Sequence, residues 1–121
     1  MTRSLRELDA DLSKVTPERA KYDYWNAIQN LLVCMPDPMD DEVFQQRLRE
    51  WADRGRGFVM YSFTQGFPPD RYPGIIEAQP PGLVARFDAI AEEMNTLYRA
   101  GQLTGQKVLE VAEEMRRLCY G

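Results

Sequence analysis

The sequence has no histidine among its 121 residues. Histidine is the commonest general base near neutral pH and the commonest protein ligand of transition metals. Ser-His-Asp and Cys-His catalysis, histidine-bound zinc and di-iron bundles of the Glu-x-x-His type all require it. We therefore expect no catalytic residue, cofactor or metal site. Our interpretation leans against an enzyme, because catalysis would have to rely on Asp, Glu, Tyr or Cys.

Cysteine is scarce, and long apolar runs are missing. Cys34 and Cys119 lie far apart and form no Cys-x-x-Cys motif, so we expect both to be free, buried thiols. No stretch approaches the roughly 20 apolar residues of a membrane-spanning helix. No signal-peptide pattern precedes the charged residues 3–11. We predict a cytoplasmic protein without a membrane partner.

An excess of positive charge is also missing. The formal net charge is -4, from 19 acidic and 15 basic side chains spread along the chain, so nucleic acid is an unlikely partner for electrostatic reasons. Four arginines gather near aromatic residues, at positions 47, 49, 54 and 56. They could hold a phosphate or a carboxylate, but Glu50 and Asp53 lie among them. We favour a solvated helix end.

Helical patterns cover most of the chain, which at 44% hydrophobic content suits a single domain over residues 1–121. Leucines at positions 5, 8 and 12, with a Ser4–Glu7 capping box, predict a first helix to about residue 14. The triplet 16–18, Thr-Pro-Glu, predicts the start of a second helix that ends near residue 34. Acidic residues 40–42 open a third, which Gly55 or Gly57 should end. We predict a mainly α fold of four to five helices.

Residues 82–119 predict an antiparallel helical hairpin. Apolar residues recur at steps of three and four on both sides of Gly101, and Thr104 can cap the second helix. They are Leu83, Phe87, Ile90, Met94, Leu97, Val108, Val111, Met115 and Leu118. This seam can be internal core or can join copies of the chain, so a homo-oligomer through the hairpin stays open.

The segment 57–82 interrupts the helical pattern, because it holds five of the eight prolines and five aromatic residues. Residues 58–63 predict either one short strand or an extended segment whose rings attach it to the core. Ile75 and Ile76 are the other candidate strand residues, which leaves open a small β hairpin or strand addition by a second molecule.

This aromatic and proline-rich insert is our candidate binding surface, because irregular segments held on a rigid scaffold often carry function. Aromatic and arginine side chains are enriched at the centres of interfaces. The candidate partner-binding residues are Tyr61, Phe63, Phe67, Arg71 and Tyr72. The rings can instead pack under the insert. The leading hypothesis is a small non-catalytic interaction protein, meaning a subunit, adaptor or inhibitor that binds another protein.

A small-molecule-binding domain is the alternative. In that interpretation Trp25, Trp51, Tyr61 and an arginine line an apolar pocket. It requires a cavity of ligand size beside those rings.

Two short patterns are similar to known families. Residues 97–115, LYRAGQLTGQKVLEVAEEM, resemble the helical hairpin of SHOCT-type modules. The order of Trp25, residues 41–42 (Asp-Glu), Trp51 and residues 101–104 (Gly-Gln-Leu-Thr) resembles the helical N-terminal part of nitrile hydratase β subunits and their activator proteins. The second resemblance implies a metal-free accessory subunit of a metalloenzyme. The insert fits neither family, so we assign the chain to none.

Overall fold

The computed structural model describes residues 15–37 and 40–121. Within these ranges the chain forms five helices and no strand, which confirms the mainly α prediction. The helices are α2 (Pro17–Val33), α3 (Asp41–Asp53), α4 (Phe63–Gly66), α5 (Leu83–Arg99) and α6 (Gly105–Tyr120). The helix predicted to end near residue 14 lies outside the described residues.

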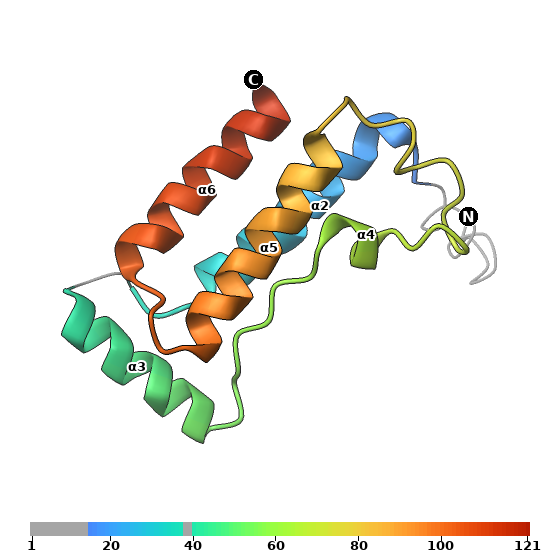
Figure 1. Cartoon of the computed structure of the whole chain (residues 1–121). Helices are drawn as coiled ribbons and strands as arrows, with labels where there is room; N and C mark the ends of the chain where they lie inside the picture. The colour runs from blue at the N-terminus through green and yellow to red at the C-terminus, as the bar shows by residue number, and fades with distance from the viewer. Residues whose placement is uncertain (1–14, 38–39) are drawn as a thin grey trace, which may run out of the picture.

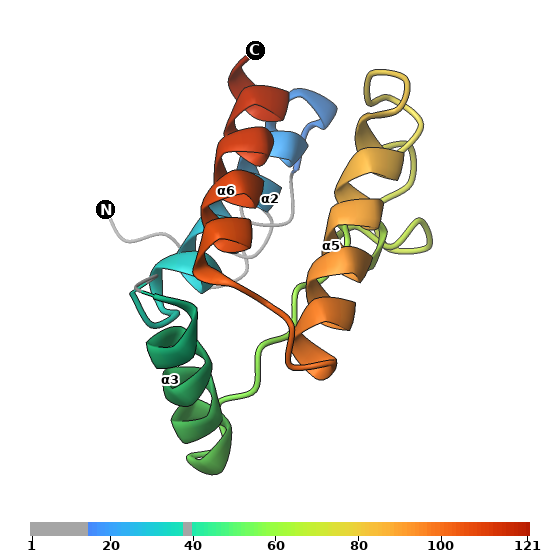
Figure 2. The ribbon, with the colours of Figure 1, turned by 60° about the vertical axis from the view of Figure 1, so that its left-hand side comes forward.

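Helix α2 begins where the sequence predicts. The Thr16 hydroxyl accepts a hydrogen bond from the Arg19 amide at 3.3 Å, and Pro17 occupies the first helical position. This arrangement satisfies an amide that the helix itself cannot pair. The buried face of α2 contains Ala20, Tyr24, Trp25 and Ile28. It packs against α6 (Figures 1 and 2), and its Tyr24 ring lies 4.9 Å from the Phe87 ring of α5.

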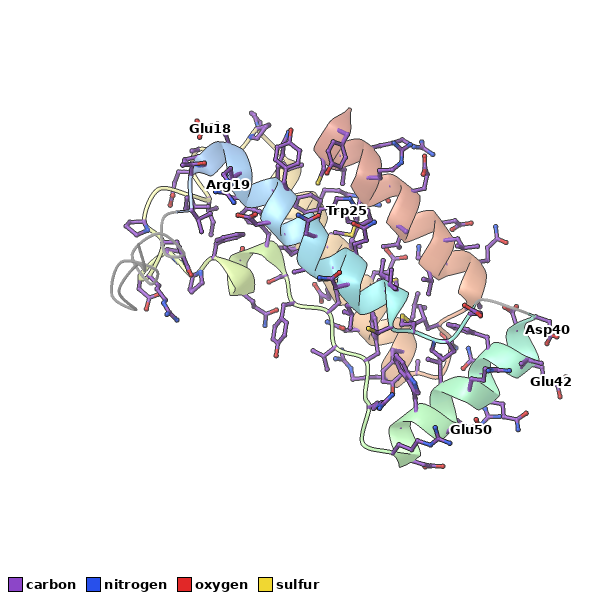
Figure 3. All side chains as sticks on the ribbon, turned by 180° about the vertical axis from the view of Figure 1, so that it is seen from behind. Glu18, Arg19, Trp25, Asp40, Glu42 and Glu50 are labelled. Atoms are coloured by element: carbon purple, nitrogen blue, oxygen red, sulfur yellow. The ribbon has the colours of Figure 1, made fainter. Side chains whose placement is uncertain are left out.

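The acidic residues before and within the first turn of α3 have a structural role. The Asp40 carboxylate accepts a hydrogen bond from the Val43 amide at 3.1 Å, and Figure 3 shows Asp40 and Glu42 at this end of the helix. Negative charge near a helix N-terminus is favoured by the helix dipole. Gly55, with φ of 78°, follows the helix, in agreement with the prediction. The Gln45 side chain donates to the Leu103 carbonyl and so connects α3 to the α5–α6 turn.

Helices α5 and α6 form the predicted antiparallel hairpin. Gly101 adopts φ of 69° in the turn, and the Thr104 hydroxyl caps α6 by accepting from the Lys107 amide at 3.1 Å. Apart from the half-buried Leu97 and Leu118, the seam residues are buried within the chain. Their burial completes a core that also includes residues of α2, α3 and the insert.

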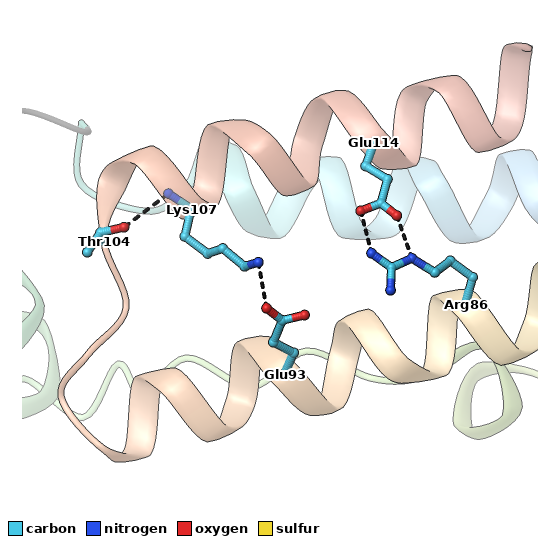
Figure 4. A network of polar contacts seen from close by, with 5 residues as sticks. All are labelled: Arg86, Glu93, Thr104, Lys107 and Glu114. Carbon is cyan, nitrogen blue, oxygen red and sulfur yellow. Dashed lines mark hydrogen bonds and ion pairs between the residues drawn. The ribbon is translucent and has the colours of Figure 1, made fainter.

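Helix α6 packs against α2 as well as against α5 (Figures 1 and 2). Two ion pairs connect α5 to α6 along their outer side (Figure 4). The Arg86 guanidinium binds both carboxylate oxygens of Glu114, with one N–O distance of 2.7 Å, and Lys107 pairs with Glu93 at 2.5 Å. These side chains are partly exposed, so each pair contributes on the order of 0.5 kcal/mol.

The insert contains no β hairpin among the described residues. Residues 58–62 are extended instead, with Phe58 and Met60 buried and Val59 and Tyr61 exposed. The candidate second strand forms hydrogen-bonded turns, such as the one from the Ala78 amide to the Gly74 carbonyl at 3.2 Å. The extended segment, which was the other interpretation, then leads into the short helix α4.

Candidate functional site

A side chain takes the place of the missing neighbouring strand beside residues 58–62. The Asn95 carboxamide accepts from the Met60 amide at 2.7 Å and donates to the Met60 carbonyl at 2.8 Å. Met60 is completely buried, and its backbone groups need partners there. Asn95 therefore fixes the extended segment on α5. The alternation of an extended chain then directs Val59 and Tyr61 away from the core.

Two further interactions hold the next residues in place. Ser62 and Gln65 form a reciprocal capping box around α4, with distances of 3.1 and 2.9 Å. Asp88 on α5 accepts from both the Thr64 amide, at 3.2 Å, and the Thr64 hydroxyl, at 2.6 Å. A four-residue helix is too short to be stable alone. Its position thus depends on these contacts with α5 and on its buried rings.

A fourth interaction comes from α2. The Tyr24 hydroxyl donates to the Tyr61 carbonyl at 2.8 Å. Burial, followed by the nearby charge of Asp88, raises the pKa of the Tyr24 hydroxyl well above its ordinary value. Tyr24 therefore remains a protonated donor at any physiological pH. Residues 60–64 are consequently fixed from both α2 and α5.

A cluster of aromatic rings lies beneath this segment. Phe63 contacts Tyr24, Phe67 and Phe87, with ring centroids 5.4, 4.9 and 5.9 Å apart, and Tyr72 meets Phe67 edge-on at 5.4 Å. Offset and edge-on contacts of this kind add stability beyond the apolar area they bury. The cluster anchors the insert and leaves only part of it free to contact other molecules.

An open apolar groove of about 510 Å³ runs between α2 and the insert. We call it the α2–insert groove. Its lining is mostly apolar, and Asp23, Tyr24, Tyr61, Ser62 and Gln65 are the lining residues with polar side chains. The lining residues are Asp23, Tyr24, Ala27, Ile28, Leu31, Val59, Tyr61, Ser62, Gln65, Gly66 and Phe67. At its edge Tyr61 is 64% exposed and Val59 is 56% exposed.

The structure separates the five candidate partner-binding residues. Tyr61 lies exposed on the groove, and Arg71 is exposed outside its lining. Tyr72 is half-buried against the core. Phe63 is completely buried and does not line the groove, whereas Phe67 is 8% exposed and lines it. Both rings belong to the aromatic cluster that supports the segment, and the assignment of the five residues to a partner stays a prediction.

The pocket expected for a small molecule has a different composition. A cavity of ligand size exists beside Tyr61, but Trp25 is buried in the core and Trp51 is half-buried elsewhere. Neither tryptophan lines the groove, and none of the arginines in the described part of the chain lines it. The aromatic residues can be read from the sequence, but their spacing does not show which of them line the same cavity.

The residues that sequence analysis missed are those that fix the insert. Asp88, Ala91 and Asn95 follow one another at steps of three and four on α5, next to the apolar seam. Ala91 is buried between the two polar residues. The sequence contained one signal for these contacts, which is a stripe of small and polar residues beside the hydrophobic seam of α5. It could not identify Met60 and Thr64 as the partners.

The two thiols differ, which corrects the expectation that both are buried. Both are free, but Cys34 is exposed at the end of α2, whereas Cys119 is buried. The Cys119 thiol lies 3.5 Å from the Lys21 carbonyl, and burial raises the pKa of Cys119 to about 11. Only Cys34 is accessible to a reagent in the folded chain.

Residues 15–37 and 40–121 include no helix that is both long and apolar enough to cross a membrane. The same residues contain no cluster of three or more Cys, Asp or Glu side chains that could hold a metal ion. No protein-family model, curated protein or solved structure matches the chain.

Proposed function

We propose that this chain is a small non-catalytic interaction protein that binds another protein through the α2–insert groove. The single observation that carries the proposal is the exposed Tyr61 beside an apolar groove whose position is fixed by hydrogen bonds from two helices. An amphipathic helix of the partner is the occupant that fits. Asp23, Ala27 and Leu31 follow one face of α2, so the groove runs along a helix for about 12 Å.

The fixed position of Tyr61 supports this proposal. Its backbone carbonyl is bonded to Tyr24, and the residue before it is bonded to Asn95. Binding therefore orders little more than the Tyr61 side chain. A preorganised aromatic residue gives contact area at a low cost in conformational entropy.

The chemistry of the groove also favours an apolar partner surface. Ala27, Leu31 and Val59 leave apolar area in contact with water, while Ser62 and Gln65 lie at the side where a partner could make hydrogen bonds. Interfaces usually combine an apolar centre with a polar rim. We further propose a cytoplasmic location, which the two free cysteines support.

A small apolar molecule is the second candidate occupant. The groove volume of about 510 Å³ lies within the usual range for ligand sites. The groove is open to solvent along the exposed side chains of Ala27 and Tyr61. An open surface suits the extended contact of a protein better than the enclosure of a small ligand.

The test is affinity capture from the native host with the Tyr61→Ala variant, compared with Tyr120→Ala. Tyr120 is similarly exposed, at 60%, but lies on α6 outside the groove. Any captured protein is then purified and titrated with both variants. A central aromatic contact is worth roughly 2 kcal/mol, so Tyr61→Ala should weaken binding about 30-fold.

Equal affinities for the wild type, Tyr61→Ala and Tyr120→Ala would contradict the proposal. If an apolar small molecule co-purifies instead and is lost only from Tyr61→Ala, the second candidate replaces the first.

A further inference from the structure

We propose that a pocket between α3 and the α5–α6 turn binds a phosphate group through Arg49 and Arg99. The phosphate is either inorganic phosphate or the phosphate ester of a small molecule. None of the described residues lines both this pocket and the α2–insert groove, so the inference does not depend on the proposed function.

The fold brings together two arginines that lie far apart in the sequence. Arg49 belongs to α3 and Arg99 to the last turn of α5, and α3 lies beside the α5–α6 turn (Figures 1 and 2). Both side chains line a pocket of about 210 Å³. The lining residues are Gln45, Leu48, Arg49, Ala52, Tyr98, Arg99, Gly101 and Leu103. Within residues 15–37 and 40–121, no Asp or Glu lines it, so its two charged groups are both positive.

The pocket takes only one member of the arginine group seen in the sequence. Of the four arginines at positions 47, 49, 54 and 56, Arg49 lines the pocket and the others do not. Glu50 and Asp53, which alternate with these arginines along the chain, are also outside the lining. The acidic residues that weakened a phosphate interpretation of the sequence therefore do not contribute to this pocket.

The two elements that carry the arginines are fixed to each other. The Gln45 carboxamide donates to the Leu103 carbonyl, and the side chains of Leu48 and Leu103 are buried. Tyr98 is half-buried, and its ring lies 5.7 Å from the Phe58 ring. A bound anion would therefore order little more than the two arginine side chains, which keeps the entropic cost of binding low.

The C-terminal end of α5 does not need Arg99 to pair its carbonyls. The last carbonyls of a helix carry partial negative charge and attract cations. Here the carbonyls of residues 96, 97 and 98 accept from the amides of residues 100, 102 and 101, at 3.0, 2.8 and 3.0 Å. The Arg99 guanidinium donates to the Thr96 hydroxyl at 3.5 Å, which is too long for a strong hydrogen bond. Arg99 can therefore turn to a ligand at little cost.

Two guanidinium groups suit a phosphate better than a carboxylate. Each guanidinium offers a planar fork of N–H donors that matches the oxygens of either group. A phosphate ester carries about 1.5 to 2 negative charges at pH 7 and three acceptor oxygens, so it can engage both forks. A carboxylate carries one charge and is satisfied by one fork. The volume of about 210 Å³ is smaller than that of most ligand pockets, so a single small group fits.

Titration of the isotope-labelled full chain, followed by nuclear magnetic resonance at constant ionic strength, tests the site. Inorganic phosphate should shift the amide signals of Gly101 and Leu103 in a saturable way. Arg49→Gln and Arg99→Gln should each weaken binding at least about tenfold, because each removes charge-assisted hydrogen bonds. Arg47→Gln is the matched control, since it removes the same charge from an exposed position of α3 outside the pocket. It should change the affinity by less than about twofold.

Glycerol 3-phosphate and acetate are the other arms of the titration. Tighter binding of glycerol 3-phosphate than of inorganic phosphate would identify an ester as the ligand, and equal or weaker binding would identify the free ion. Acetate that binds as tightly as phosphate would overturn the assignment of a phosphate group. The absence of saturable shifts with both phosphate compounds would overturn the site. Wild-type affinity in either Arg49→Gln or Arg99→Gln would do the same.

Discussion

The carboxamide of Asn95 pairs with both the amide and the carbonyl of Met60, at 2.7 and 2.8 Å, as a neighbouring strand would. A single extended segment can therefore lie against a helix without leaving its buried backbone groups unpaired. The next residue, Tyr61, is held outward at the edge of the α2–insert groove.

The first prediction concerns this pair. Asn95→Ala leaves the buried Met60 backbone without partners, so we expect a loss of about 1–3 kcal/mol in the free energy of unfolding. Urea denaturation measures the change. Thr96→Ala, at the exposed neighbouring position of α5, is the control and should change stability by less than about 0.5 kcal/mol. Equal stability of the two variants would show that the Asn95 contact is not important.

The second prediction separates two aromatic residues that are two positions apart. Phe63 is completely buried, so Phe63→Ala should cost about 3–5 kcal/mol through lost contacts and a cavity. Tyr61 is 64% exposed, so Tyr61→Ala should cost less than about 0.5 kcal/mol. Thermal and urea unfolding of both variants check this. Similar losses for the two substitutions would contradict the assignment of support to Phe63 and contact to Tyr61.

The sequence predicts the helices well where local signals act alone. Thr16 before Pro17 marks the start of α2, and Thr104 after Gly101 marks the start of α6, because caps and turns depend on only a few neighbouring residues. The spacing of the seam identifies the faces of α5 and α6 for the same reason.

The insert could be predicted only in part. The alternation of residues 58–63 is visible in the sequence, but which alternate side chains face inward depends on Asn95, thirty-five positions after Met60. Helix α4 has a capping-box signal in Ser62 and Gln65, yet a single turn also needs Asp88. Long-range partners of this kind leave no local pattern.

The third prediction concerns the thiols. A disulfide reagent should modify Cys34 rapidly in the folded chain, whereas Cys119 is buried and its pKa is raised to about 11 by burial. We expect one reactive thiol per chain in buffer and two in denaturant, counted by absorbance. Cys34→Ser should abolish the rapid reaction. Rapid modification of both thiols in the folded wild type would contradict the packing of Cys119.

The fourth prediction concerns acid stability. The hydrogen bond from Arg86 lowers the pKa of Glu114. A lowered folded-state pKa stabilises the protein above the unfolded value, which is about 4.3 for Glu, and this stability is lost as the pH falls through the folded value. Both side chains are more than one third exposed, so the effect is below about 1 kcal/mol.

Glu114→Gln should therefore be slightly less stable than the wild type at pH 7, and the difference should shrink below about pH 4.3. Urea unfolding across this pH range measures it. Glu92→Gln is the control, because Glu92 is exposed and makes no ion pair with other described residues. A pH-independent difference for Glu114→Gln would show that the ion pair with Arg86 does not contribute.

Site-specific photo-crosslinking tests most directly whether the α2–insert groove is the binding surface. A photoreactive residue replaces Ala27, which is exposed and lines the groove, and in a second chain it replaces Leu109, which is 58% exposed on α6 outside the groove. Both chains are irradiated in the native host. We expect one defined protein adduct at position 27, lost on Tyr61→Ala, and none of the same mass at position 109. An adduct at position 109 alone, or one at position 27 that persists in Tyr61→Ala, would contradict the proposed binding surface.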